Sequence, residues 1–142
     1  MSDLYPEPGW NFVFGEATLD ERVGVYSLVR YFPGFTGEKD TPAARTLGLL
    51  RSFKVLSHET GHMFGLHHCA RFECLMNGSN SLDETDRSPA TLCPVCLKKL
   101  AWNLHFDMRR RYASLLAVYE REGLTELARW TEARLQKIGP ER

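Results

Sequence analysis

The segment that decides the fold reads His58-Glu59-Thr60-Gly61-His62-Met63-Phe64-Gly65-Leu66-His67-His68. Two histidines four residues apart lie on one face of a helix, one turn from each other. Neutral imidazoles in that arrangement can both bind one zinc ion. We therefore expect His58 and His62 to lie on a helix and to be ligands of a catalytic-type zinc site.

The other defined positions of this segment fit the same chemistry. Glu59 follows the first histidine, so it points slightly away from the metal and can contact a metal-bound water, as a general base does. A catalytic zinc takes three protein ligands and keeps an open position. His68 can be the third ligand only if the helix stops before it. Gly65 permits that stop, because glycine tolerates the left-handed conformation that commonly ends a helix.

Four of the five histidines fall in this segment. Five defined positions at fixed spacing make a chance match rare, on the order of one in a hundred thousand. The alternative is a helix with surface histidines and no metal. We interpret His67 as a solvent-facing or outer-sphere residue, and an exchange of roles between His67 and His68 stays open. We interpret the isolated His105 as an ordinary helix residue.

The four cysteines form two close pairs separated by a loop, the usual layout of a tetrahedral structural zinc site. They are Cys69, Cys74, Cys93 and Cys96. Such a site would pin the otherwise irregular segment 69–93, and two disulfides or four free thiols are the alternatives. Because Cys69 follows His68 directly, one backbone turn would anchor both metals. The sequence thus predicts two zinc ions per chain, one catalytic and one structural, with the first depending on the second.

The N-terminal half of the chain predicts two strands and one long helix. The aromatic and β-branched stretches Trp10–Ala17 and Val23–Tyr31 are typical of adjacent antiparallel strands. A polar loop follows over 32–40. Thr41 and Pro42 are a good N-cap and first helical residue, and the helix should run to about Gly65. Its expected buried stripe consists of Leu47, Leu50, Phe53, Leu56 and Met63.

The C-terminal half predicts further helices after an irregular stretch. Residues 66–93 contain short polar segments and three of the four cysteines. Leucine, methionine and tyrosine at steps of three or four residues indicate a helix from Cys96 to about Tyr119. Gly123 should break it, and a last short helix should follow around 127–135.

Length and charge narrow the class of protein. A chain of 142 residues fits a single domain over 1–142. Its 18 acidic and 18 basic side chains cancel, which argues against a nucleic-acid or membrane partner. The basic run Arg109-Arg110-Arg111 is interpreted as a solvated helix face rather than a nucleic-acid site. The N-terminus lacks the features of a signal peptide, so we expect a cytoplasmic location and reduced cysteines. We also expect a monomer.

These motifs together resemble the archaemetzincin family. His58, Glu59, His62, Gly65 and His68 match the metzincin pattern H-E-x-x-H-x-x-G-x-x-H, and Met76 matches the methionine of the following turn. The directly following cysteine and its partners are specific to archaemetzincins. The resemblance extends to Tyr5-Pro6, to 11–15 and to 92–97, and so covers roughly residues 4 to 120. At Gly78 the chain departs from the metzincins that carry a tyrosine two residues after that methionine.

The resemblance implies an α+β, metzincin-like zincin fold. A small twisted mixed sheet would lie over the active-site helix, with a zinc-pinned irregular segment and a C-terminal helix packed behind. Met76 would form an apolar floor beneath the histidines. The implied function is that of a zinc metallopeptidase acting on a peptide or protein substrate, with Glu59 as general base. The peptide would lie extended beside the edge strand of the sheet.

A different class of function also fits the chain. The same residues could form a zinc-stabilised peptide- or protein-binding module with an inactive peptidase site. The presence of Glu59 argues against that alternative, because a purely structural metal has no use for this carboxylate.

Overall fold

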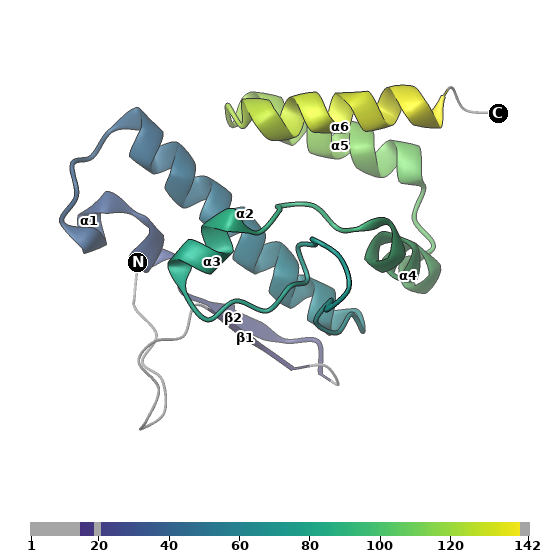
Figure 1. Cartoon of the computed structure of the whole chain (residues 1–142), viewed down its shortest axis with the longest axis horizontal. Helices are drawn as coiled ribbons and strands as arrows, with labels where there is room; N and C mark the ends of the chain where they lie inside the picture. The colour runs from purple at the N-terminus through teal and green to yellow at the C-terminus, as the bar shows by residue number, and fades with distance from the viewer. Residues whose placement is uncertain (1–14, 19–20, 140–142) are drawn as a thin grey trace. The chain divides into compact units, whose positions relative to one another are not determined.

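The computed structural model describes residues 15–18 and 21–139. The chain divides into two compact units, Met1–Leu100 and Ala101–Arg142, and the boundary falls inside helix α4 (Pro94–Leu104). The architecture is α+β and mostly helical (Figure 1). Each unit is described by itself below, and the single domain over 1–142 stays a prediction.

The first unit begins with a short antiparallel strand pair. Strands β1 (Gly15–Ala17) and β2 (Gly24–Tyr26) pair with Gly15 opposite Tyr26, and both contact helix α2. The predicted antiparallel pair is therefore confirmed, although residues 10–14 of the predicted first strand lie outside the described residues. The described part of the chain holds only this pair, so the small twisted mixed sheet is not confirmed.

The predicted second strand is too long, because the chain leaves the extended conformation after Tyr26. Val29–Tyr31 forms the 3₁₀ helix η1, and Pro33–Thr36 forms the short helix α1. Phe32 lies between them in an extended conformation, the one that a following proline favours. The expected loop over 32–40 thus begins with a helical turn.

Helix α2 spans Pro42–Met63 and confirms the predicted active-site helix. The Thr41 hydroxyl accepts a hydrogen bond from the backbone N–H of Ala44 at 3.1 Å, and Pro42 occupies the first turn. The Thr41 hydroxyl thus satisfies one of the otherwise unpaired N–H groups of a helix start, and Pro42 has no N–H that could be left unpaired.

The buried face of α2 differs from the predicted leucine stripe. Leu47 and Leu56 are 39% and 41% exposed, so that prediction is wrong for both. The buried residues are instead Gly48, Ser52, Lys54 and Gly61. A Cβ atom at Gly48 would lie 2.7 Å from the Tyr31 carbonyl oxygen and 2.9 Å from the Phe32 ring. Small residues face this side because the preceding turn approaches the helix backbone closely.

The segment 66–93 is mostly irregular, as predicted, but it contains the short helix α3 (Leu82–Arg87). The single helix expected over 96–119 is two helices, α4 and α5 (Met108–Arg121). His105 lies between them with a positive φ of 51°, so its interpretation as a helix residue is wrong. Asp107 then caps α5 by accepting a hydrogen bond from the N–H of Arg110.

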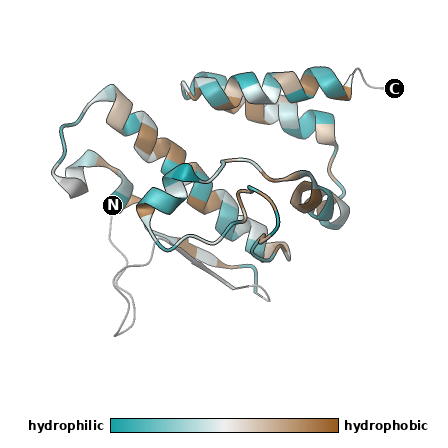
Figure 2. Cartoon of the chain, in the orientation of Figure 1, coloured by the Kyte–Doolittle hydropathy of each residue, from teal (hydrophilic) through white to brown (hydrophobic). Residues whose placement is uncertain are grey.

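The second unit is a helical hairpin. Helices α5 and α6 (Thr125–Ile138) pack against each other, and the chain reverses at Gly123 (φ 70°). Tyr112 contacts Trp130, with ring centroids 6.0 Å apart, and Thr131 is fully buried. Hydrophobic and hydrophilic residues are both distributed along these helices (Figure 2), as expected where one side is buried. No helix in the described ranges is long and apolar enough to cross a membrane.

We predict that Gly48→Ala destabilises the protein although alanine favours a helix by about 0.8–1 kcal/mol. The added methyl group would force Tyr31 and Phe32 outward, at a cost of about 1–3 kcal/mol. Gly34→Ala is the control, because a Cβ atom there meets nothing within 4 Å. Urea unfolding in excess zinc, followed by circular dichroism, measures both. Equal stability of the two variants would contradict the close approach.

Candidate active site

Three histidines converge at the C-terminal end of α2. The ring nitrogens of His58, His62 and His68 all lie within 4.8 Å of one another. Their ring centroids are 4.7 Å apart for His58 and His62, 5.2 Å for His58 and His68, and 4.9 Å for His62 and His68. His67 is exposed and lies outside this cluster. The structure thus brings together the histidines that the sequence singled out, and their role as ligands stays a prediction.

The end of α2 explains how His68 reaches the cluster. The N–H of Leu66 donates to the Gly61 carbonyl at 3.0 Å, and the N–H of Gly65 donates to the His62 carbonyl at 2.9 Å. This pair of hydrogen bonds is a Schellman motif, which requires a left-handed residue after the helix. Gly65 supplies it with a φ of 80°. The predicted role of Gly65 in stopping the helix is confirmed.

Backbone carbonyls orient two of the imidazoles. His58 Nδ1 lies 2.8 Å from the Leu75 carbonyl oxygen, and His62 Nδ1 lies 2.7 Å from that of Leu66. A carbonyl only accepts, so each Nδ1 carries the proton and each Nε2 of the neutral ring keeps its lone pair. The two Nε2 atoms are 3.0 Å apart. The two Nε2 atoms therefore face one shared position, which a metal cation or a proton can occupy.

A zinc ion fits that arrangement. With Zn–N distances of 2.0–2.1 Å, two ligand nitrogens of a tetrahedral site are about 3.3 Å apart. Burial lowers the pKa of His58, which favours the neutral ring that a metal requires. Hydrogen bonds from the second ring nitrogen to protein carbonyls are typical of zinc-binding histidines. The residues present therefore fit the metal that the sequence predicts.

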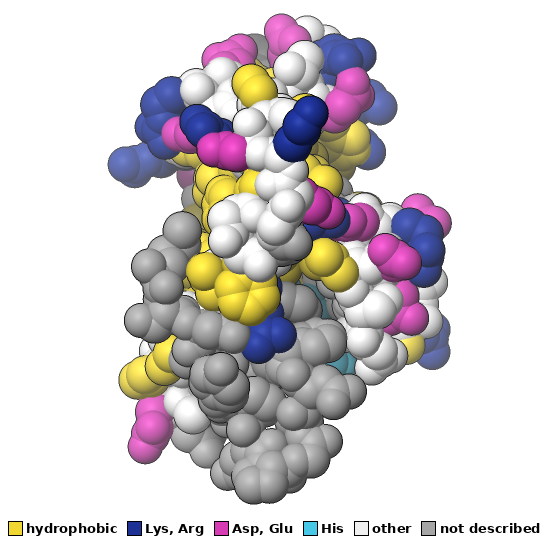
Figure 3. All heavy atoms as spheres, turned by 90° about the vertical axis from the view of Figure 1, so that its left-hand side faces the viewer, with side chains coloured by type: hydrophobic (Ala, Val, Ile, Leu, Met, Phe, Trp, Pro, Cys, Tyr) yellow, Lys and Arg dark blue, Asp and Glu magenta, His cyan; other side chains and the backbone are white. Residues whose placement is uncertain are grey.

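Glu59 lies beside the histidine cluster at a cavity of about 460 Å³. Its carboxylate is half-buried, and this burial raises its pKa, which the nearby His62 and His68 partly offset. The cavity is lined by residues of α2, of the segment 75–81 and of the region around α3: Lys54, Val55, His58, Glu59, His68, Leu75, Asn77, Ser79, Ser81, Thr85, Ser88 and Pro89. Figure 3 shows histidine surface only as small recessed areas.

Met76 and Gly78 approach the histidines from the segment that follows. Met76 is 0% exposed, and a Cβ atom at Gly61 would lie 2.6 Å from its sulfur. It therefore packs against α2 between the first two histidines, as expected of an apolar floor. A Cβ atom at Gly78 would lie 3.3 Å from His68 Nδ1. A side chain at position 78 would touch that ring.

The four cysteines form a second cluster. The sulfur atoms of Cys69, Cys74, Cys93 and Cys96 lie within 4.8 Å of one another, and all four are free thiols. Tetrahedral Zn–S bonds of 2.3 Å place sulfurs about 3.8 Å apart, and Cys69 and Cys93 are separated by 4.0 Å. The N–H of Cys93 donates to the sulfur of Cys74 at 3.2 Å. Backbone N–H groups, first that of Arg71, lower the pKa of Cys69 to about 7, whereas burial raises the pKa of Cys74 and Cys96. The spacing of the sulfurs is therefore what fits a thiolate-bound zinc.

Asn77 holds the loop that carries Cys69 and Cys74 and also lines the cavity with His58 and His68, and no sequence motif pointed to it. Its amide nitrogen donates to the carbonyls of Cys69 and Phe72, and its amide oxygen accepts from the N–H of Cys74 at 2.8 Å. The N–H of Cys69 donates to the Met76 carbonyl at 2.8 Å. The only sequence signal is the general tendency of asparagine to bind backbone groups in irregular segments.

The comparisons with known proteins agree with this geometry. A model of peptidase family M54 matches residues 1–102. The chain belongs to peptidase family M54. The match includes every residue of both clusters. The second unit lies almost wholly beyond it, so the family evidence concerns the unit that carries the candidate site.

Relatives in family M54 include archaemetzincins of animals and archaea. Archaemetzincin-2 of Macaca fascicularis is 43% identical over 138 residues, which cover 82% of this chain and 38% of the relative. The archaemetzincin of Pyrococcus horikoshii is 45% identical over 102 residues, covering 72% of this chain and 52% of the relative. This chain therefore spans well under two thirds of the length of these relatives.

A solved structure supports the fold of the M54 chain. The zinc-dependent peptidase from Methanocorpusculum labreanum superposes with a TM-score of 0.59 at 38% identity. The superposition covers 69% of this chain and 49% of that protein. The likeness supports the mostly helical α+β fold for this part of the chain.

We predict that Asn77→Ala weakens metal binding at both clusters, because its amide holds the loop that carries Cys69 and Cys74. Each lost hydrogen bond to a buried backbone group costs about 1–3 kcal/mol, so affinity should fall at least about tenfold. Cobalt titration, with thiolate absorption for the cysteine cluster, measures this. Asn80→Ala is the exposed control. An unchanged affinity at both clusters would contradict the role of Asn77 in holding this loop.

Proposed function

We propose that this chain is a zinc-dependent metallopeptidase that hydrolyses peptide bonds at the histidine cluster. The observation that carries the proposal is the set of three converging imidazoles beside a half-buried carboxylate on an open cavity. A relative with this fold is described as a zinc-dependent peptidase. Natural substrates would be peptides or proteins.

His58, His62 and His68 would hold the catalytic zinc. When bound, zinc lowers the pKa of a coordinated water toward ~7 and polarises a carbonyl group. The carbonyls of Leu66 and Leu75 keep two of the imidazoles in the tautomer that presents Nε2. The protein's part is to hold this geometry before substrate arrives.

Glu59 would act as the general base and then as the general acid. It lies on the same cavity as His58 and His68, next to the place where the peptide carbonyl would sit. Its carboxylate would take a proton from the attacking water and deliver it to the leaving amine nitrogen. Partial burial makes the carboxylate a stronger base than one in free solution.

Cys69, Cys74, Cys93 and Cys96 would hold a second, structural zinc. Four thiolates close the coordination shell, so this metal would have no open position for substrate. Its contribution would be to keep the segment after α2 in place, including the Leu75 carbonyl that orients His58. Two zinc ions per chain are proposed on this basis.

We also propose the metzincin-like arrangement of a small sheet over α2. The contacts of β1 and β2 with α2 and their antiparallel pairing support it. An extended substrate peptide would then add to the edge of this sheet by main-chain hydrogen bonds. The cavity at Glu59 would receive one of its side chains.

We predict that Glu59→Gln retains zinc but lowers kcat/KM by at least about 10²–10⁴-fold, because the amide cannot accept the proton of water. The measurement combines cleavage of a fluorogenic peptide library with zinc analysis. His67→Ala is the matched control, since His67 is exposed and outside the cluster.

Full residual turnover in the Glu59→Gln variant would exclude the general-base role. A wild-type chain that binds zinc and peptides but cleaves none would instead favour the binding module with an inactive site.

A further inference from the structure

Lys54 lies one turn before His58 on α2 and is buried despite its charge. Only 7% of the residue is exposed. Its ammonium nitrogen donates to the carbonyl oxygens of Thr85, Asp86 and Ser88 at 2.8, 3.0 and 2.6 Å. A lysine ammonium has three N–H donors, so all of them are used. These carbonyls belong to the C-terminal end of α3, where a helix leaves its carbonyls unpaired.

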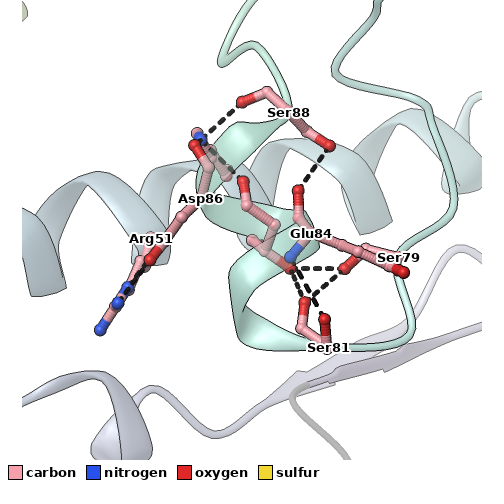
Figure 4. Close-up of polar contacts among 8 residues, drawn as sticks. Arg51, Ser79, Ser81, Glu84, Asp86 and Ser88 are labelled. Atoms are coloured by element: carbon pink, nitrogen blue, oxygen red, sulfur yellow. Dashed lines mark hydrogen bonds and ion pairs between the residues drawn. The ribbon is translucent and has the colours of Figure 1, made fainter.

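Arg51 holds the same helix through a side chain. Its Nε and Nη2 atoms donate to the two carboxylate oxygens of Asp86 at 2.8 and 2.5 Å, and the two side chains are only 14% and 30% exposed. This bidentate geometry is the strong form of such a pair. Arg51 and Lys54, three residues apart on one face of α2, therefore form a clamp on α3. Figure 4 shows its Arg51–Asp86 pair.

Helix α3 depends on this clamp because it is only six residues long. A helix of that length is not stable by itself in water. Its own hydrogen bonds are local: Ser81 accepts from the N–H of Glu84, Ser88 donates to the Glu84 carbonyl, and Ser79 pairs with Thr85. Figure 4 shows Glu84, Ser79 and Ser81 close to one another. The clamp supplies the contacts of α3 to α2.

The clamped helix forms one side of the cavity beside the histidines. Ser81, Thr85 and Ser88 line the cavity opposite Val55 and Glu59 of α2. The hydroxyls on that side already have partners within the segment. Lys54 also lines the cavity, and its ammonium is fully occupied by carbonyls. Apart from the histidines of the cluster, no described lining residue has a cationic N–H donor left to bind an acidic side chain.

We propose that Arg51 and Lys54 are positioning residues that hold α3 as one side of the substrate cavity, and that this cavity receives an uncharged side chain. The inference deepens the proposed peptidase function and rests on it for the identity of the ligand. A lysine in a cavity lining would, by itself, predict selection of acidic side chains. Here all three N–H donors of Lys54 bind carbonyls, so none is left to bind an acidic side chain.

The test uses zinc-loaded protein and three short peptide hydroxamates that differ in one side chain: glycine, leucine or aspartate. Calorimetry should show the leucine probe binding at least about tenfold more tightly than the glycine probe, the range that apolar pocket contacts provide. The aspartate probe should bind no better than the glycine probe. Preferential binding of the aspartate probe would overturn the proposal.

The Lys54→Met variant tests the clamp itself. The control is Lys98→Met, because Lys98 is an exposed lysine on α4. Lys54→Met should retain zinc, lose hydrogen-exchange protection in 82–88 and bring the leucine-to-glycine affinity ratio close to one. Lys98→Met should behave as wild type. Unchanged protection and an unchanged ratio in Lys54→Met would overturn the positioning role.

Asp86→Ala decides the matter if Lys54→Met does not fold. This substitution removes the carboxylate that Arg51 binds, at a residue that is more exposed than Lys54. We expect smaller losses of hydrogen-exchange protection in 82–88 and of the leucine-to-glycine affinity ratio. Normal protection of 82–88 in this variant would contradict the clamp. Hydrogen exchange requires neither probe binding nor turnover, so a failure of the peptidase function, seen as no binding of any hydroxamate, is distinguished from a failure of the clamp.

Discussion

The candidate site depends on two backbone carbonyls that accept hydrogen bonds from histidine rings. The Leu66 carbonyl orients His62, and the Leu75 carbonyl orients His58. Without them each ring could rotate or take the other tautomer, and the nitrogens would no longer face one point. The Leu66 carbonyl is in place because α2 ends in a Schellman motif at Gly65. The Leu75 carbonyl is in place because Asn77 and the cysteine cluster order the segment 69–77, to which Leu75 belongs.

Close packing against neighbouring segments explains why α2 carries residues that weaken a helix. Gly48 admits the turn at Tyr31, and Gly61 admits the sulfur of Met76. Each glycine costs about 1 kcal/mol of helix propensity relative to alanine, and the close packing that it permits offsets this cost. Lys54 is a further exception on the buried face, where its charge is tolerated because three carbonyls surround it. The composition of α2 therefore favours packing against neighbouring segments over intrinsic helix stability.

Contacts between residues of a recognisable motif were predictable from the sequence, and contacts with distant backbone carbonyls were not. The cap at Thr41, the stop at Gly65 and the convergence of His58, His62 and His68 follow from spacing and residue type, and the structure confirms them. The burial of Lys54 was not predictable, because its partners are carbonyls 31 to 34 residues away, and every residue has a carbonyl.

The same reason accounts for the other differences. Hydrophobic spacing predicted burial of Leu47 and Leu56, but the elements that pack on α2 cover its glycine and serine side instead. Periodicity also joined α4 to α5, because a hydrophobic repeat does not reveal a single left-handed residue such as His105.

The central claim, that the histidine cluster is a zinc site separate from the cysteine cluster, is tested most directly by elemental analysis. Protein purified without added metal or chelator, as wild type and as His58→Ala/His62→Ala, should contain close to two zinc ions per chain and close to one, respectively. A wild-type content near one that the double variant retains would contradict the account, because only the cysteine cluster would then bind metal.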